Sequence, residues 1–339
     1  MGRWRVTMAL VRSLVARRDA LPKRALAAAR VAGLLASLAV VAWVADRGVR
    51  AVNLATIRPG LLAGSLVAGL VAWLGLGRGW ADLTAASSPA RAVATWSRTQ
   101  ALRYLPGAIW APASRAATVP GRRRRQVATV VTEAAVTLAV AVAVGGVLLA
   151  AGGSPWWALG LLALPAALAL PAVLALPAVL TRLAPGGRTQ RSALAESEVV
   201  GCSEVGVGRP ASPAPVAPAA PVVSFNRLRA ALAWYLGSWV AYGASVALAQ
   251  AAVGPLGSPW RVAGAGCLAW AAGFVTIIAP SGAGAREVAY LALLAGTGPR
   301  GRLAAGAVAS RLTFTAAELV VLAVVVVQRL RARENSAAP

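Results

Sequence analysis

Three glutamates lie inside or at the edge of long apolar segments, where a carboxylate is costly. The chain of 339 residues holds only ten Asp and Glu, and Glu133, Glu287 and Glu318 are the ones in apolar surroundings. A charged side chain at the bilayer centre costs about 2.5–3.5 kcal/mol on insertion scales, so each should face a bundle interior or a water-filled cavity. Two of them have an arginine nearby. Arg286 adjoins Glu287, and Arg311 lies two helical turns before Glu318.

Two kinds of chemistry fit these charges. In the first, the carboxylates and arginines form buried ion pairs that only fix the register of the helices. In the second, they line a polar cavity that holds a charged headgroup while the acyl chains of the same molecule stay in the lipid. A phosphate-bearing headgroup needs cationic donors, and the planar fork of arginine matches phosphate oxygens in pairs.

Two glycine- and proline-containing breaks interrupt the apolar pattern, one in each half of the chain. The first is "RYLPGAIW" at 103–110 and the second is "PSGAGARE" at 280–287. A break frees backbone groups, which is tolerable at membrane depth only beside protein or a polar cavity. A pair of broken segments in the two halves is typical of a transporter-type binding site between them, and freed amides can bind anions.

These patterns define one set of candidate residues for a lipid headgroup or cavity site. The set is Arg103, Tyr104, Pro106, Gly107, Trp110, Glu133, Pro280, Gly282, Gly284, Arg286, Glu287, Arg311 and Glu318.

The composition is that of a membrane protein, since 58% of the residues are hydrophobic and 13% are charged. There is no histidine, which excludes imidazole catalysis and His-ligated metals. Cys202 and Cys267 have neither disulfide-framework nor metal-site spacing. We therefore predict no cofactor, no metal and no catalytic residue. The net charge of +24 comes from arginines at the ends of apolar segments, which indicates membrane topology rather than nucleic-acid binding.

The apolar segments predict an all-α, polytopic integral membrane bundle of about eight membrane segments, with two broken or re-entrant elements. The expected crossings are 31–45, 59–77, 127–151, 156–181, 230–253, 260–279, 287–297 and 303–327. Residues 78–126 are too charged for a regular crossing and are expected to be interfacial or re-entrant. In the first half, Gly64, Gly69, Gly75 and Gly77 offer close helix contacts.

The pattern divides the chain into five regions, with both termini predicted on the cytoplasmic side of the plasma membrane. They are a basic N-terminus (1–30), a first membrane half (31–183), a flexible Pro-rich cytoplasmic loop (184–226), a second membrane half (227–328) and a basic cytoplasmic tail (329–339).

The two breaks resemble motifs of the transmembrane, flippase-like region of the lysylphosphatidylglycerol synthase family. Members carry a lysine or arginine with Y-[LI]-P-G-x-[VI]-W in the first half and P-G-G-x-G-x-R-E in the second. "SRLTFTAAEL" (310–319) and the helix with Glu133 also fall where the family has an Arg-bearing and a Glu-bearing helix. The resemblance covers about residues 30–330 and departs from the family pattern at Ser281 and Ala108.

The resemblance implies a protein that binds or translocates a lipid with a charged or phosphate-bearing headgroup, either a phospholipid or a polyprenyl-phosphate lipid. No soluble aminoacyl-transferase domain follows Pro339, so the lipid-handling half alone is expected, and a transporter rather than an enzyme. Two alternatives stay open. One is a membrane glycosyltransferase-related protein acting with a polyprenyl-phosphate-linked sugar, for which Asp46 stands alone in its loop. The other is an accessory protein that works with a biosynthetic partner protein.

Overall fold

The computed structural model describes residues 23–104, 110–119, 123–154, 225–255, 257–276 and 280–337. Every regular element in these ranges is a helix, which confirms the all-α prediction for this part of the chain. Four of the described helices are long and apolar enough to cross a membrane. They are α3 (Pro59–Leu83), α6 (Arg123–Ala151), α9 (Phe225–Val253) and α12 (Arg300–Ala337).

The predicted count of about eight crossings is not confirmed. Residues 260–279 and 287–297 correspond to α10 (Pro259–Val275) and α11 (Ala285–Leu293), which are 17 and 9 residues long. At 1.5 Å per residue, α11 covers roughly 14 Å, about half of a hydrocarbon core. The expected crossing 31–45 lies within α2 (Lys23–Ala51), and 156–181 lies outside the described residues.

Two of the predicted polar regions coincide only in part with the described residues. The Pro-rich loop 184–226 lies outside the described residues except for its last two positions, which begin α9. The predicted C-terminal tail is not a separate segment, because α12 continues to Ala337. Its three basic residues, Arg329, Arg331 and Arg333, therefore lie in the last turns of α12.

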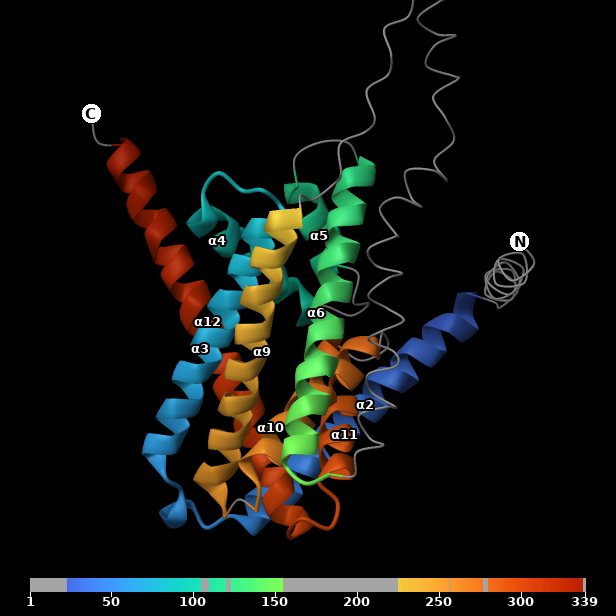
Figure 1. Ribbon diagram of the computed structural model, residues 1–339. Helices are drawn as coiled ribbons and strands as arrows, with labels where there is room; N and C mark the ends of the chain where they lie inside the picture. The colour runs from blue at the N-terminus through green and yellow to red at the C-terminus, as the bar shows by residue number, and fades with distance from the viewer. Residues whose placement is uncertain are drawn as a thin grey trace, which may run out of the picture.

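The antiparallel helices α3 and α9 form the centre of the bundle, and α12 packs against both (Figure 1). Small residues let α3 and α9 approach closely. Ser65 Oγ donates to the Ser245 carbonyl at 2.8 Å, and Ser245 Oγ donates back to the Ser65 carbonyl at 2.8 Å. A Cβ on Gly79 would lie 2.9 Å from the Tyr235 ring, and one on Gly75 would meet Ser238. The predicted glycine-mediated contact is thus present at Gly75.

A first hairpin of short helices fills one end of the bundle (Figure 1). It consists of α4 (Pro89–Ala101), the 3-10 turn η2 (Leu102–Tyr104) and α5 (Trp110–Thr118). Ser88 caps α4 by accepting from the backbone N–H of Arg91, and Pro89 begins the helix with a φ suited to it. α4 follows the end of α3 and α5 precedes the start of α6, so this hairpin starts and ends at the same end of the bundle.

A second hairpin enters from the opposite end (Figure 1). It consists of α10, the 3-10 turn η3 (Pro280–Gly282) and α11. Ser281, Gly282 and Gly284 have φ of +53°, +66° and +82°, which stops the helix and turns the chain back. Ser258 at the start of α10 and Gly296 beyond α11 line the same surface pocket. This hairpin too therefore starts and ends at one end of the bundle.

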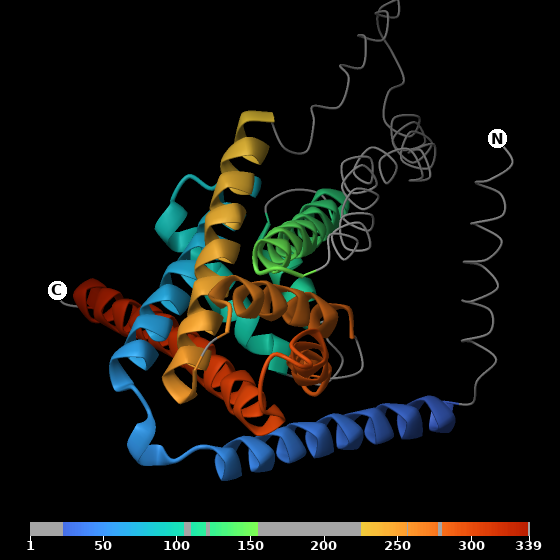
Figure 2. The same cartoon turned by 60° about the horizontal axis from the view of Figure 1, so that its bottom comes forward.

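The tips of the two hairpins meet inside the bundle, because η2 lies against η3. Helix α2 runs along the outside, packing on α12 and α11 (Figure 2). At Gly284 the backbone of α2 comes so close that a Cβ would lie 3.3 Å from Ser37. The two breaks that the sequence placed more than a hundred residues apart are thus neighbours in space.

Candidate functional site

Each of the three glutamates in apolar surroundings forms an ion pair with an arginine from another element. Glu318 of α12 pairs with Arg103 of η2, and Glu133 of α6 with Arg115 of α5. Glu287 of α11 pairs with Arg311 of α12. All three glutamates are buried. Buried ion pairs between these groups are therefore present, although the partners differ from those that the sequence suggested.

The expected partners were neighbours along the chain. Arg286 is adjacent to Glu287, and Arg311 lies on the same helix as Glu318, yet neither combination forms an ion pair. Adjacent residues on a helix point in different directions, and two turns of helix separate side chains by about 11 Å. Arg311 instead reaches Glu287 on the facing helix.

The Arg103–Glu318 pair connects the first break to the last helix. Tyr104 donates its hydroxyl to the same carboxylate, so both side chains of the "RY" motif bind Glu318. The Arg103 guanidinium also lies 5.3 Å from the centre of the Trp73 ring, a cation–π contact.

Glu287 has two tasks at the second break. One carboxylate oxygen accepts from the backbone N–H of Gly284 at 2.7 Å, which caps the start of α11. The other accepts from Arg311. Because the break leaves the Gly284 amide without a helical partner, the glutamate stabilises the bend and also holds α12 against it.

Arg115 is the most buried arginine of the site and was not among our predicted residues. Its exposed fraction is 5%, and its guanidinium lies 5.6 Å from the ring centres of both Trp80 and Trp96. Trp96 Nε1 donates to Glu133 at 3.1 Å. The local sequence "WAPASRAAT" has no periodicity that would place Arg115 inward. The unusual count of 12 tryptophans was the available signal, since tryptophan faces accept arginine.

A cavity of about 400 Å³ lies between the two hairpin tips and the long helices. It is lined by Arg103 and Arg115 from the first hairpin and by Arg286 and Gly282 from the second. Glu133 contributes a carboxylate from α6. Arginines from both halves of the chain thus line one space.

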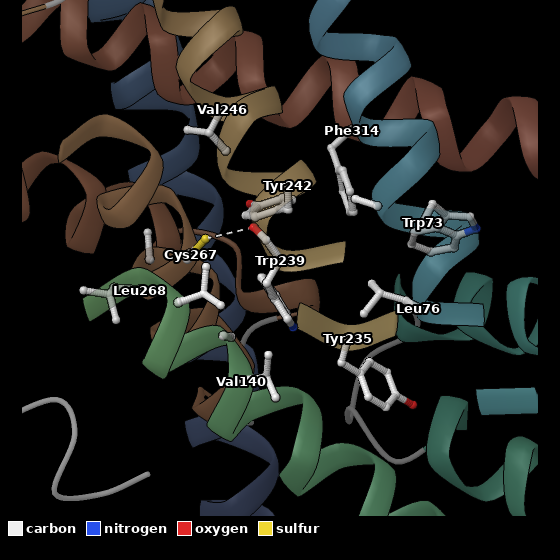
Figure 3. Packing of buried hydrophobic residues seen from close by; sticks show 14 of the residues in the cluster. Trp73, Leu76, Val140, Tyr235, Trp239, Tyr242, Val246, Cys267, Leu268 and Phe314 are labelled. Atoms are coloured by element: carbon white, nitrogen blue, oxygen red, sulfur yellow. Dashed lines mark hydrogen bonds between the residues drawn. The ribbon is translucent and has the colours of Figure 1, made fainter. Parts of the chain in front are cut away.

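The remaining wall of the cavity is largely aromatic. Tyr242 of α9 packs between Trp239 of the same helix and Phe314 of α12 (Figure 3). Phe314 in turn lies near Trp73 of α3. The ring centres of Tyr242 and Phe314 are 4.9 Å apart, and those of Trp73 and Phe314 are 5.8 Å apart. Trp96, Trp270 and Phe274 also line the space. Such a wall suits the apolar part of an amphipathic ligand.

Arg286 is held in the cavity by the Tyr242 hydroxyl and by close packing on Gly273. Its Nη2 donates to the Tyr242 hydroxyl at 2.5 Å. Its aliphatic stem crosses Gly273, where a Cβ would meet the stem directly. Gly282 approaches the same glycine so closely that its own Cβ would lie 2.5 Å from Gly273 Cα. Gly273 was not predicted, and nothing in its local sequence distinguishes it from other helical glycines.

A second, much smaller pocket shares Tyr242 and Arg286 with the cavity. It measures about 20 Å³, room for about one water molecule, and is lined in part by Tyr242, Arg286, Glu287 and Arg311. Tyr290, also in its wall, donates to Gln250 at 3.0 Å. The polar surroundings of the second break therefore continue beyond the cavity.

Of the thirteen predicted residues, Arg103, Glu133, Gly282 and Arg286 line the cavity, and Glu287 and Arg311 line the smaller pocket beside Arg286. Tyr104, Gly284 and Glu318 are not in the cavity wall but are bonded to these residues. The other four are placed differently. Pro106 and Gly107 are outside the described residues. Trp110 begins α5 with an exposed fraction of 50% and is not part of the cavity wall. Pro280 begins η3, and its side chain is outside the described part.

The fold and the site together are those of a helical membrane protein with an internal, arginine-lined cavity. No family model and no curated protein matches the chain. The resemblance to the lysylphosphatidylglycerol synthase transmembrane region thus stays an expectation that depends on the two motifs.

The close packing of Arg286 and Gly282 on Gly273 leads to a first prediction. We expect Gly273→Ala to lower the free energy of unfolding by about 1–3 kcal/mol, because the methyl group must displace Arg286 or the η3 backbone. Denaturation of the purified protein with SDS would measure the change. Gly237→Ala on α9 is the matched control, since a Cβ there meets nothing within 4 Å, and it should be neutral or slightly stabilising. Equal stability of the two variants would show that the close packing at Gly273 does not contribute to stability.

Proposed function

We propose that this protein binds a lipid with a charged or phosphate-bearing headgroup and moves it across the membrane. The observation that carries the proposal is the cavity in which arginines from both halves of the chain face an aromatic wall. A headgroup would bind the guanidinium groups, and the adjoining apolar part of the lipid would pack on the aromatic side chains.

The surroundings of the cavity support a lipid rather than a small soluble ligand. The long helices expose apolar side chains outward, including Val67, Val71 and Leu74 of α3, which are 46–58% exposed. In a bilayer these side chains contact acyl chains. A lipid can therefore keep its chains in this environment while its headgroup enters the bundle.

The two hairpins support a movement across the membrane. They start at opposite ends of the bundle, and their tips η2 and η3 touch beside the cavity (Figure 1). Broken elements that meet from both sides at a site near mid-membrane are typical of alternating-access transporters. Displacement of one tip would open the cavity toward one side.

We further propose that the protein lies in the cell membrane with the first-hairpin end in the cytoplasm. Three long helices have arginines at this end, namely Arg123–Arg125 in α6, Arg227 and Arg229 in α9, and Arg329 and Arg331 in α12 (Figure 1). Arginines that flank membrane helices are retained on the cytoplasmic side.

A lipid-scrambling assay tests the proposal. Purified protein is reconstituted into liposomes with fluorescent phospholipid in both leaflets, and a membrane-impermeant quencher reports the lipid that moves outward. We expect faster movement than in protein-free liposomes. Arg286→Ala should slow it roughly ten- to a hundredfold, because a charge-assisted hydrogen bond contributes about 1.5–3 kcal/mol.

The matched control is Arg300→Gln, which removes an exposed arginine at the start of α12, outside the cavity. Its rate should equal that of the wild type. If Arg286→Ala moves lipid as fast as the wild type, Arg286 does not bind the headgroup.

A further inference from the structure

We infer that the cavity selects a singly charged anionic group, a phosphodiester or a carboxylate, with Arg286 as its counter-ion. This inference depends on the proposed function, because it specifies the headgroup class that the same cavity accepts.

Around the cavity, each of three arginines is balanced by a glutamate, and one arginine is not. Three glutamates each have one arginine, in the pairs Arg103–Glu318, Arg115–Glu133 and Arg311–Glu287. Arg286 is the fourth arginine of this group, and within the described residues it has no carboxylate partner. The described side chains of the site therefore carry a net charge of +1, which is located at Arg286.

The contacts of Arg286 leave its charge available to a ligand. Its hydrogen bond is to the neutral hydroxyl of Tyr242, which screens but does not neutralise the guanidinium. Because that hydroxyl accepts from Arg286, its own proton remains free to be donated to an anionic oxygen. Arg286 and Tyr242 both line the cavity. A bound anion can thus receive hydrogen bonds from two adjacent groups.

A second negative charge on the ligand would have no counter-ion. The other two arginines of the cavity, Arg103 and Arg115, are bound to carboxylates. Glu133 itself lines the cavity and would repel a second charge. An uncompensated charge in a site of low dielectric is strongly unfavourable. The site should therefore favour a phosphodiester over a dianionic phosphomonoester or a diphosphate.

Binding measurements with four probes test this inference and separate it from the proposed function. The lipids are didecanoyl phosphatidylglycerol, a phosphodiester, and didecanoyl phosphatidic acid, a phosphomonoester. The soluble probes have no acyl chains. Dimethyl phosphate is a phosphodiester, and inorganic phosphate, like a phosphomonoester, gains a second negative charge between pH 5 and pH 8.5. Affinities are measured by calorimetry on the detergent-purified protein at pH 5 and pH 8.5.

The change of pH alters the charge of the monoester and leaves the diester unchanged. A phosphomonoester loses its second proton near a pKa of about 6, so phosphatidic acid is a monoanion at pH 5 and a dianion at pH 8.5. We expect similar affinities of the two lipids at pH 5 and a roughly tenfold weaker binding of phosphatidic acid at pH 8.5. Arg103, Arg115, Tyr242, Glu133, Glu287, Tyr290 and Arg311 surround Arg286. Because phosphatidylglycerol keeps its charge between pH 5 and pH 8.5, a change in its affinity between the two pH values would report titration of these protein groups.

Variants identify the counter-ion. Arg286→Gln should weaken phosphatidylglycerol binding roughly tenfold, Arg286→Lys should recover part of it because it keeps the charge, and Arg300→Gln should have no effect. Wild-type affinity in Arg286→Gln would overturn the assignment. Circular dichroism and elution as a single species confirm that each variant is folded.

The remaining outcomes separate the two proposals. If phosphatidic acid binds at pH 8.5 as tightly as at pH 5, or more tightly, the selection for a single charge is overturned and lipid binding is left intact. Dimethyl phosphate that binds while neither lipid does would support the charge selection and refute the lipid function. If none of the four probes binds, both proposals fail.

Discussion

The Glu133→Ala variant will lose about 3–5 kcal/mol of the free energy of unfolding, because it leaves the buried guanidinium of Arg115 without a counter-ion. This is the most buried ion pair of the described residues, with side chains 6% and 5% exposed. The Trp96 indole N–H loses its acceptor in the same step. Unfolding by SDS, followed by loss of helical circular dichroism, measures the effect.

The double variant Arg115→Met with Glu133→Leu separates a missing contact from an unpaired charge. Replacing both partners of a buried ion pair with apolar residues is often neutral or stabilising. We expect the double variant to recover at least half of the loss seen in Glu133→Ala, with the remainder due to Trp96. A double variant less stable than the single one would contradict this account of the pair.

The second large effect is expected from exchanging the charges of Arg103 and Glu318. Arg103→Glu places two carboxylates together, and Glu318→Arg places two guanidinium groups together, in a site where the side chains are 19% and 7% exposed. Each single variant should lose about 3–5 kcal/mol or more and elute largely as aggregate. Their combination restores an ion pair and should regain a folded species on size-exclusion chromatography.

Recovery in this exchange will be partial, since the cation–π contact of Arg103 with Trp73 is lost. The control is the same exchange at Asp46 and Arg50, a pair on α2 whose side chains are 50% and 78% exposed. That exchange should change stability by less than about 1 kcal/mol. If the double variant at Arg103 and Glu318 is no better than the worse single one, η2 does not lie against α12 as described.

Much of the fold could be predicted from local sequence. The apolar segments at 59–77 and 230–253 correspond to α3 and α9. Between α3 and α6, the polar region 78–126 forms short elements, α4, η2 and α5, and no long helix among its described residues. The break at 280–287 is also present, with positive φ at Ser281, Gly282 and Gly284. Each of these features depends on residues close together in the chain.

The partners of the charged residues could not be predicted in this way. Arg103 and Glu318 are separated by 215 positions, and Arg311 and Glu287 by 24. Sequence proximity instead suggested Arg286 with Glu287, which the geometry of a helix prevents. Gly273 and Arg115 were missed because their roles exist only where another element packs on them.

The sequence by itself determined an apolar helical chain, two positions where helices must break, and a few charges too costly to face lipid. Only the tertiary structure decided that the hairpin tips meet, which arginine pairs with which glutamate, and that Arg286 has no carboxylate partner among the described residues. The reason is physical. Helix formation, backbone breaks and the cost of burying a charge depend on a residue and its near neighbours. An ion pair depends on side chains that packing brings together from distant parts of the chain.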